Sequence, residues 1–226
     1  MSEHSAPTLR ARLDRFKALA DGVFSIALTL LIIDVVAAAK GITPGMTLAE
    51  HLRHHWQTGA AYLVGFLTIF VCWINQHVVL DDVEHADGRL LWTGGLQLGL
   101  VSAVPLPTAL LAEYTAGADG HTAFAMYGIT FLLIATSFWA LSRAVTRSGL
   151  ARGAESHMRL LKLQGAYRIA IGWNVLCLLA LRADLRIALP MWVLMFGVFA
   201  FPDRFAELVH RRSSSHLRTS AEIPPV

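Results

Sequence analysis

One stretch of the sequence is rich in histidine: His51, His54 and His55 form the pattern H-x-x-H-H. On a helix this spacing lets two imidazoles share a face, where they could bind zinc. No cysteine or further ligand set accompanies them, so histidines of a solvated loop are the favoured interpretation. We therefore expect no cofactor and no resident metal, while metal binding by these three histidines stays open.

A second cluster combines histidine with carboxylates, since His85 lies among Asp81, Asp82 and Asp87. Such a group motivates a membrane enzyme as one hypothesis. No Ser or Cys nucleophile motif and no convincing metal-ligand set accompanies the cluster. The sequence therefore predicts that the protein is not an enzyme.

The first apolar run, residues 22–39, carries a stripe of large aliphatic side chains. Ile26, Leu30 and Ile33 recur at intervals of four and three residues, and Ser25 lies beside them, which places all four near one face of a helix. On composition alone, contact with lipid or with another helix is the favoured reading of this stripe.

Charged residues bracket the stripe. Arg15 and Asp21 precede it and Asp34 follows it. A charge at membrane depth is costly and normally faces protein, water or an ion pathway. Asp34 is therefore either part of such a pathway or a group that caps or pairs at a helix end, and both interpretations remain open.

The composition shows which elements must position these residues. The chain has 226 residues, of which 55% are hydrophobic and 15% are charged, which is too apolar for an ordinary soluble domain. Hydropathy predicts six transmembrane helices, at about 22–39, 60–80, 90–112, 122–142, 165–182 and 186–202. Residues 1–212 are thus expected to form one all-α, six-helix membrane domain, and residues 213–226 a disordered cytoplasmic tail.

The first run has an alternative interpretation. Basic residues precede it and it ends in Ala37-Ala38-Ala39, a pattern also typical of a cleaved signal peptide. The run is long for a signal-peptide core and contains a carboxylate, so a membrane span is favoured.

The basic residues indicate a topology. Fifteen of the 19 Lys and Arg residues fall before the first span, after the second and fourth spans, or in the tail. The positive-inside rule then predicts that both termini are cytoplasmic and that the number of spans is even. Although the net charge is +3, the cations lie between apolar runs rather than in one stripe, so no nucleic-acid partner is expected.

Two motifs resemble those of the transmembrane protein 175 family of lysosomal and prokaryotic potassium channels. The stretch RFKALAD at residues 15–21, followed by Ser25-Ile26 and Thr29, is similar to the family's first-helix signature. The interval from arginine to aspartate matches, whereas Leu19 and Ala20 replace a Phe and a Ser. The stretch WINQH at residues 73–77 is similar to the family's Trp-x-Asn-His stretch, with Gln76 at the expected histidine position and His77 next to it.

This resemblance implies a homotetramer in which four copies of the first helix line a central pore. By position, the pore constriction would be formed by Ile26, Leu30 and Ile33, and Ser25, Thr29 and Asp34 would be polar residues of the pore lining. An apolar constriction gates by dewetting and opposes ions through the cost of removing their hydration water. Potassium holds its water less strongly than sodium, so such a ring obstructs it less.

The resemblance also implies a structural polar network of Arg15, Asp21, Trp73, Asn75 and His77, which would pack the cytoplasmic half of the first helix against its neighbours. Buried polar groups must be paired, so removal of one partner leaves another unsatisfied. For Trp73, an interfacial aromatic anchor is an equally good interpretation.

The sequence thus favours a potassium-preferring cation channel of the cell membrane, with the lipid bilayer and potassium ions as its partners. The alternative is a proton leak channel or a proton-coupled transporter, because an apolar pore that admits water also passes protons. A proton relay would need a chain of ionisable groups within the spans, and only Asp34 is well placed for one.

Overall fold

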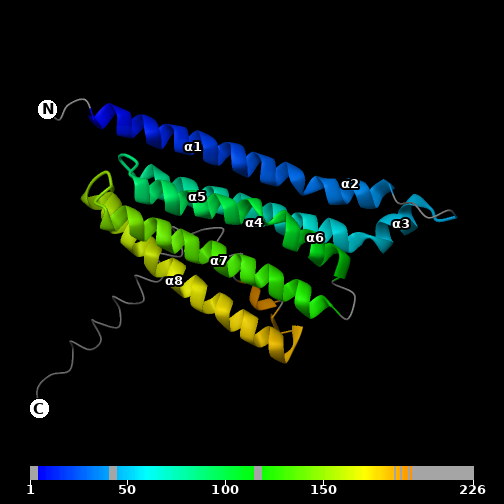
Figure 1. The fold of residues 1–226 in the computed structure, drawn as a ribbon. Helices are drawn as coiled ribbons and strands as arrows, with labels where there is room; N and C mark the ends of the chain where they lie inside the picture. Colours follow the sequence, from blue (N-terminus) through cyan, green and yellow to red (C-terminus); the bar gives the residue numbers. More distant parts are fainter. Residues whose placement is uncertain are drawn as a thin grey trace, which may run out of the picture.

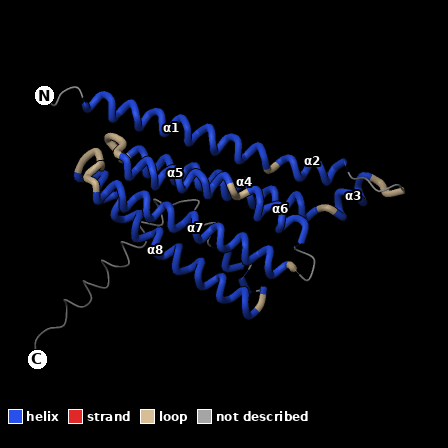
Figure 2. The backbone as a smooth tube through the Cα atoms, viewed as in Figure 1, coloured by secondary structure: helices blue, strands red, loops and turns tan. Residues whose placement is uncertain are grey.

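The computed structural model describes residues 5–40, 45–114, 119–185, 187–188, 190–192 and 194, and its named elements are all α-helices. In chain order they are α1 (Ser5–Leu30), α2 (Ile32–Lys40), α3 (Leu48–His54), α4 (Trp56–Asp81), α5 (Gly88–Ser102), α6 (Pro105–Tyr114), α7 (Gly120–Arg147) and α8 (Ala154–Ala183). Figures 1 and 2 show them as an elongated bundle with roughly parallel axes and with α1–α2 along one edge.

Five segments of the described chain are long and apolar enough to cross a membrane: Leu9–Lys40, Trp56–Asp81, Gly88–Tyr114, Gly120–Arg147 and Ala154–Ala183. They contain the first five predicted spans. The first and fifth begin well before their predicted starts, because hydropathy marks only the apolar part of a helix. Basic residues such as Arg12 and Arg159 are good helix formers and continue the helix beyond it.

The sixth predicted span, residues 186–202, lies largely outside the described residues. Its described beginning is held against α8 by two tryptophans. Trp173 Nε1 donates to the carbonyl oxygen of Met191 at 3.1 Å, and Trp192 Nε1 donates to Asn174 Oδ1 at 3.5 Å. The predicted tail at 213–226 also lies outside the described residues.

The third predicted span is two helices, α5 and α6, separated at residues 103–104. Proline has no backbone N–H and disfavours helical geometry in the preceding residue. Pro105 accordingly stands at the first position of α6, where its fixed φ suits a helix start.

The inward face of α1 explains how this helix joins the bundle. Six apolar side chains, spaced three or four residues apart, form this face, and each is at most 5% exposed. They are Leu13, Phe16, Ala20, Phe24, Ala27 and, just after α1, Leu31. They belong to the main apolar core, which includes residues of α4, α5, α7 and α8. Phe16 fits against Gly94 of α5, where an added Cβ would lie 2.4 Å from the ring atom Cζ.

Helices α7 and α8 form a closely packed antiparallel pair that contributes many residues to the main apolar core. Phe138 and Tyr167 face each other with ring centroids 5.7 Å apart, and both are 1% exposed. Their neighbours Leu141, Leu160 and Leu163 are fully buried. Figure 1 shows this pair on the opposite side of the bundle from α1.

Three segments far apart in sequence meet at one end of the bundle. The Glu84 N–H donates to the Leu150 carbonyl at 2.9 Å, and the Arg152 N–H donates to the Asp82 carbonyl at 2.9 Å. The Ala86 N–H reaches the Leu9 carbonyl at 3.4 Å. The α4–α5 and α7–α8 connections therefore lie beside the start of α1.

Candidate functional site

The face of α1–α2 turned away from the core carries the predicted constriction residues. Ile26, Leu30 and Ile33 are 61%, 43% and 56% exposed within the subunit. Leu19 extends the same stripe toward the start of the helix and is 59% exposed. These four apolar side chains are therefore exposed along the α1–α2 segment, which lies at one edge of the bundle (Figure 1).

A short interruption divides this stripe. Leu31 is not helical, so Ile26 and Leu30 belong to α1 and Ile33 belongs to α2. The Thr29 hydroxyl donates to the Ile26 carbonyl at 2.9 Å, a local bond that competes with the backbone ladder and bends helices.

The predicted polar lining residues lie in the same region of the helix. Ser25 and Thr29 are exposed, whereas Asp34, in the first turn of α2, is half-buried. Asp34 thus lies near the stripe, three residues after the interruption at Leu31.

Asp21, Trp73 and His77 come together between α1 and α4. Trp73 Nε1 donates to Asp21 Oδ1 at 3.0 Å, and His77 Nε2 lies 3.5 Å from the same oxygen. The His77 ring is oriented through Nδ1, which lies 3.0 Å from the Trp73 carbonyl and therefore donates to it. Nε2 then lacks a hydrogen in the neutral ring, so His77 donates to Asp21 only when protonated.

The other two residues of the predicted network lie elsewhere. Asn75 is buried and faces α8, where the Tyr167 hydroxyl donates to its Oδ1 at 3.2 Å. Arg15 is exposed and forms no ion pair with any residue that the structure describes. Gln76, at the position expected for histidine, is 1% exposed and lines a cavity of about 10 Å³ together with Lys17 and Asp21.

Two ion pairs that the sequence analysis missed join α1 to the α4–α5 side of the bundle. Lys17 Nζ lies 2.9 Å from Asp81 Oδ1, and Arg10 Nη2 lies 3.0 Å from Glu84 Oε1. The sequence did indicate that the basic residues before the first span could attract the acidic residues that follow the second span. Nothing in the chain pattern indicated which residues would pair.

The remaining acidic residues of that connection also have structural partners. Asp82, whose side chain is 7% exposed, lies 3.6 Å from Arg159 of α8. Asp87 is the N-cap of α5, and its carboxylate accepts the Leu90 N–H at 2.8 Å. The cluster that suggested enzyme chemistry is thus occupied with joining helices and capping one of them.

The histidine-rich stretch differs from a fully solvated loop. His51 is 1% exposed, and its Nε2 lies 2.8 Å from the Ala38 carbonyl, to which it must donate. Its ring lies 4.5 Å from that of His55 between centroids. Among the residues that the structure describes, no group of three or more His, Cys, Asp or Glu side chains is arranged to hold a metal ion.

The fold and these contacts define a helical membrane protein whose first helix presents an exposed apolar face on one side of the subunit. A profile of the endosomal/lysosomal potassium channel TMEM175 family matches residues 15–105. A potassium channel of Streptomyces collinus is 43% identical over 137 residues, 60% of this chain and 65% of its own length. A potassium channel of Chamaesiphon minutus is 36% identical over 146 residues, 63% of this chain and 71% of its own length.

The fold agrees with the sequence relatives. The crystal structure of a lysosomal potassium-selective channel TMEM175 homologue from Chamaesiphon minutus superposes with a TM-score of 0.76 and 27% identity. The match covers 86% of this chain and 99% of that one. This chain belongs to the TMEM175 family of potassium channels, which are not enzymes, and the resemblance inferred from the two motifs is confirmed.

Proposed function

We propose that this chain is the subunit of a potassium-preferring cation channel, in which the α1–α2 segments of four copies surround a central pore. The observation that supports this most is the exposed apolar face of α1–α2, which lies opposite its packed face and includes Ser25 and Thr29. Serine and threonine are enriched where membrane helices pack on one another, so their presence in this stripe favours contact among copies of the helix. The proposal also includes the sixth membrane-spanning helix that hydropathy predicts at residues 186–202.

In this proposal Ile26, Leu30 and Ile33 form successive apolar rings. A cation that passes them must shed part of its hydration shell, and the cost is smaller for potassium than for sodium. The interruption at Leu31 lies between the second and third rings, so a change of bend there would change their relative width. Asp34 lies beyond the break, where four carboxylates would concentrate cations at the outer mouth.

The proposed topology has both termini in the cytoplasm and the protein in the cell membrane. It is supported by the way the start of α1 and the α4–α5 and α7–α8 connections meet at one end of the bundle, as the positive-inside distribution requires. Asp21, Trp73 and His77 would then stabilise the cytoplasmic half of α1 against α4.

Flux measurements in liposomes test the proposal. The full chain is reconstituted with opposed potassium and sodium gradients, and wild type is compared with Ile26→Asn and Leu30→Ala. We expect passive potassium current in wild type, with higher conductance or lower selectivity in both variants because the apolar ring is opened.

Matched controls come from α7, where Ile129 and Leu133 are 50% and 48% exposed. Ile129→Asn and Leu133→Ala make the same chemical changes outside α1, and we expect wild-type selectivity from them. Equal effects of the α1 and α7 variants would refute pore lining by α1. Obligatory coupling of potassium flux to proton flux would instead establish the transporter alternative.

A further inference from the structure

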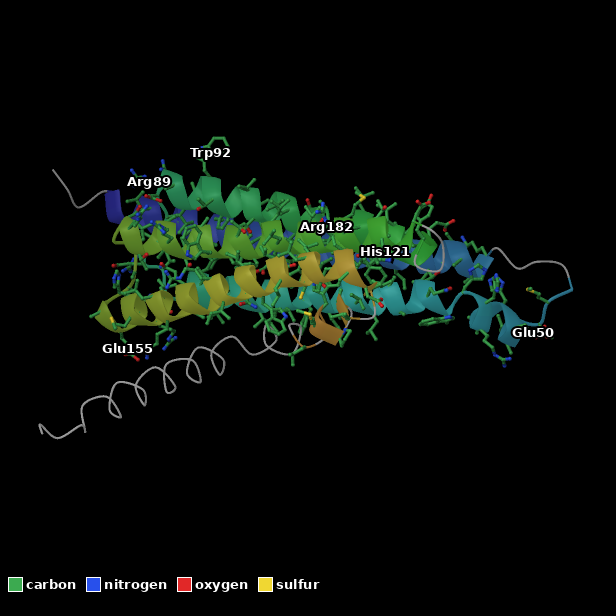
Figure 3. All side chains as sticks on the ribbon, turned by 90° about the horizontal axis from the view of Figure 1, so that it is seen from below. Glu50, Arg89, Trp92, His121, Glu155 and Arg182 are labelled. Carbon is green, nitrogen blue, oxygen red and sulfur yellow. The ribbon has the colours of Figure 1, made fainter. Side chains whose placement is uncertain are left out.

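An open groove lies between the start of α5 and the end of α7, with a volume of about 870 Å³. Its chemically distinctive lining residues are Arg89 and Trp92 of α5 and Trp139, Arg143 and Arg147 of α7, together with Asp87. Trp92 is 83% exposed, and Figure 3 shows Arg89 and Trp92 projecting outward from the same side of the bundle. The channel proposal does not use this groove.

The positive charge of the groove is not neutralised by the protein. Arg89, Arg143 and Arg147 form no ion pair among the described residues, although Arg10, Lys17 and Arg159 at the same end of the bundle all do. The Asp87 carboxylate accepts a backbone N–H as the cap of α5. The lining therefore carries three guanidinium groups and one carboxylate, which leaves the groove with an excess of positive charge.

One guanidinium group is held in place. The Cζ atom of Arg143 lies 4.8 Å from the centroid of the Trp139 ring, a cation–π contact on the half-buried wall of the groove. This contact restricts the movement of the guanidinium group, which keeps N–H donors at its edge for a ligand. A planar fork of this kind suits two phosphate oxygens at once.

The residues around the groove favour a lipid over a soluble anion as its ligand. Arginine and tryptophan at the end of membrane-spanning helices lie at the headgroup level of a bilayer. Leu96, one turn after Trp92, is 64% exposed, and Leu133 on α7 is 48% exposed, so apolar surface continues from the groove into the membrane region. An acyl chain has a surface to follow there, which a free phosphate does not need.

We propose that this groove binds the headgroup of an anionic phospholipid, with its phosphate between Arg143 and the arginines at the rim and its acyl chains along α5 and α7. Arg89 and Arg147 supply long-range attraction, and Trp92 covers the headgroup from the α5 side. The inference concerns lipid binding alone and does not depend on which ion the protein conducts.

Native mass spectrometry of the full-length protein, with phosphatidylglycerol or phosphatidylcholine added, tests the proposal. We expect wild type to prefer phosphatidylglycerol. Each arginine near a membrane surface changes binding of an anionic lipid by about five-fold, so Arg89→Gln/Arg143→Gln/Arg147→Gln should lower the affinity on the order of 100-fold. Phosphatidylcholine binding should change little.

The matched control is Lys162→Gln/Arg168→Gln/Arg182→Gln, which removes three exposed cations of α8 outside the groove. We expect it to retain phosphatidylglycerol binding. The milder variant Trp92→Phe, at a side chain exposed to solvent, provides a test if the triple variant does not fold. Quenching by brominated phosphatidylglycerol should remove a larger share of wild-type fluorescence than of Trp92→Phe fluorescence.

Four results would overturn the proposal. Equal loss of lipid in the groove variant and the α8 variant would show a general charge effect. Displacement of the lipid by millimolar glycerol phosphate would show a site for a soluble anion. Loss of oligomer mass without loss of lipid in the groove variant would show a contact between subunits. Equal quenching of wild type and Trp92→Phe would place the lipid elsewhere.

Discussion

The first membrane segment and the α7–α8 pair are both helical and apolar, but their side chains are used differently. In the most apolar part of Leu9–Lys40, 17% of residues are buried, against 50% in Gly120–Arg147 and 33% in Ala154–Ala183. The segment with the highest mean hydropathy is therefore the one least covered by its own subunit. In a membrane protein the apolarity of a helix indicates that it inserts into lipid. The burial of its side chains depends instead on which of its faces packs against another helix.

This comparison predicts the largest loss of stability for a change between α7 and α8. Phe138→Ala removes a ring that is 1% exposed and packed on Tyr167, and should lower the free energy of unfolding by about 3 to 5 kcal/mol. Ile26→Ala, on the exposed face of α1, should change it by less than about 0.5 kcal/mol. Chemical unfolding in detergent micelles measures both. Similar losses would show that the exposed face of α1 is packed within the subunit.

A second variant tests how α1 is held to the bundle. Gly94→Ala places a Cβ 2.4 Å from the buried Phe16 ring and should cost about 1 to 3 kcal/mol. No atom of the described residues lies within 4 Å of a Cβ added to its neighbour Gly95, so Gly95→Ala should be neutral or stabilising by up to about 1 kcal/mol. Thermal unfolding of the two purified variants gives the comparison. Equal melting temperatures would contradict the Phe16–Gly94 contact.

A smaller effect is expected where α1 meets α4 through polar groups. Asp21→Ala leaves Trp73 Nε1 without its acceptor and should cost about 1 kcal/mol in stability, since Asp21 is half-exposed. We also expect reduced oligomer assembly or current. Asp14→Ala is the control, at an exposed position of α1 whose side chain forms no such bond to a described residue. Unchanged assembly, current and stability in Asp21→Ala would exclude a role for this group of residues.

The smallest effect concerns α3, which precedes α4. Glu50 accepts the Thr47 N–H at 2.8 Å and the Thr47 hydroxyl at 2.9 Å, and these bonds lower the pKa of its carboxyl. Stabilisation of α3 by this cap should therefore be present above the ordinary carboxyl pKa and be lost as pH falls through the lowered value. Hydrogen exchange of α3 amides against pH measures it. Glu50→Gln should lose the pH dependence, and persistence of that dependence would assign it to another group.

Much of the fold could be predicted from the sequence because membrane insertion is a local property. The transfer of a run of some 20 apolar residues into lipid depends on those residues alone, so five of the six predicted spans correspond to observed segments. The helix break before Pro105 also depends on neighbouring residues alone, because proline fixes its own φ angle and has no backbone N–H to donate. The first-helix and Trp-x-Asn-His motifs sufficed for the family because they are contiguous in sequence.

The pairing of polar groups was decided by the tertiary structure. Lys17 and Asp81 are 64 residues apart, and Tyr167 and Asn75 are 92 residues apart, so no sequence interval connects them. The expected network of five residues separates for the same reason: Asp21, Trp73 and His77 share one helix interface, while Asn75 faces another helix and Arg15 faces outward.

The amino-acid order by itself determined that this protein enters a membrane, where its long helices lie and which end carries the positive charge, because these depend on the chemistry of neighbouring residues. The tertiary structure alone decided that Phe16, Phe24 and Leu31 pack inward while Ile26, Leu30 and Ile33 face outward. Both faces of that helix are apolar, so hydropathy cannot tell them apart. Only the rotation of α1 against α4 and α5 assigns one face to the core and leaves the other at the surface of the subunit.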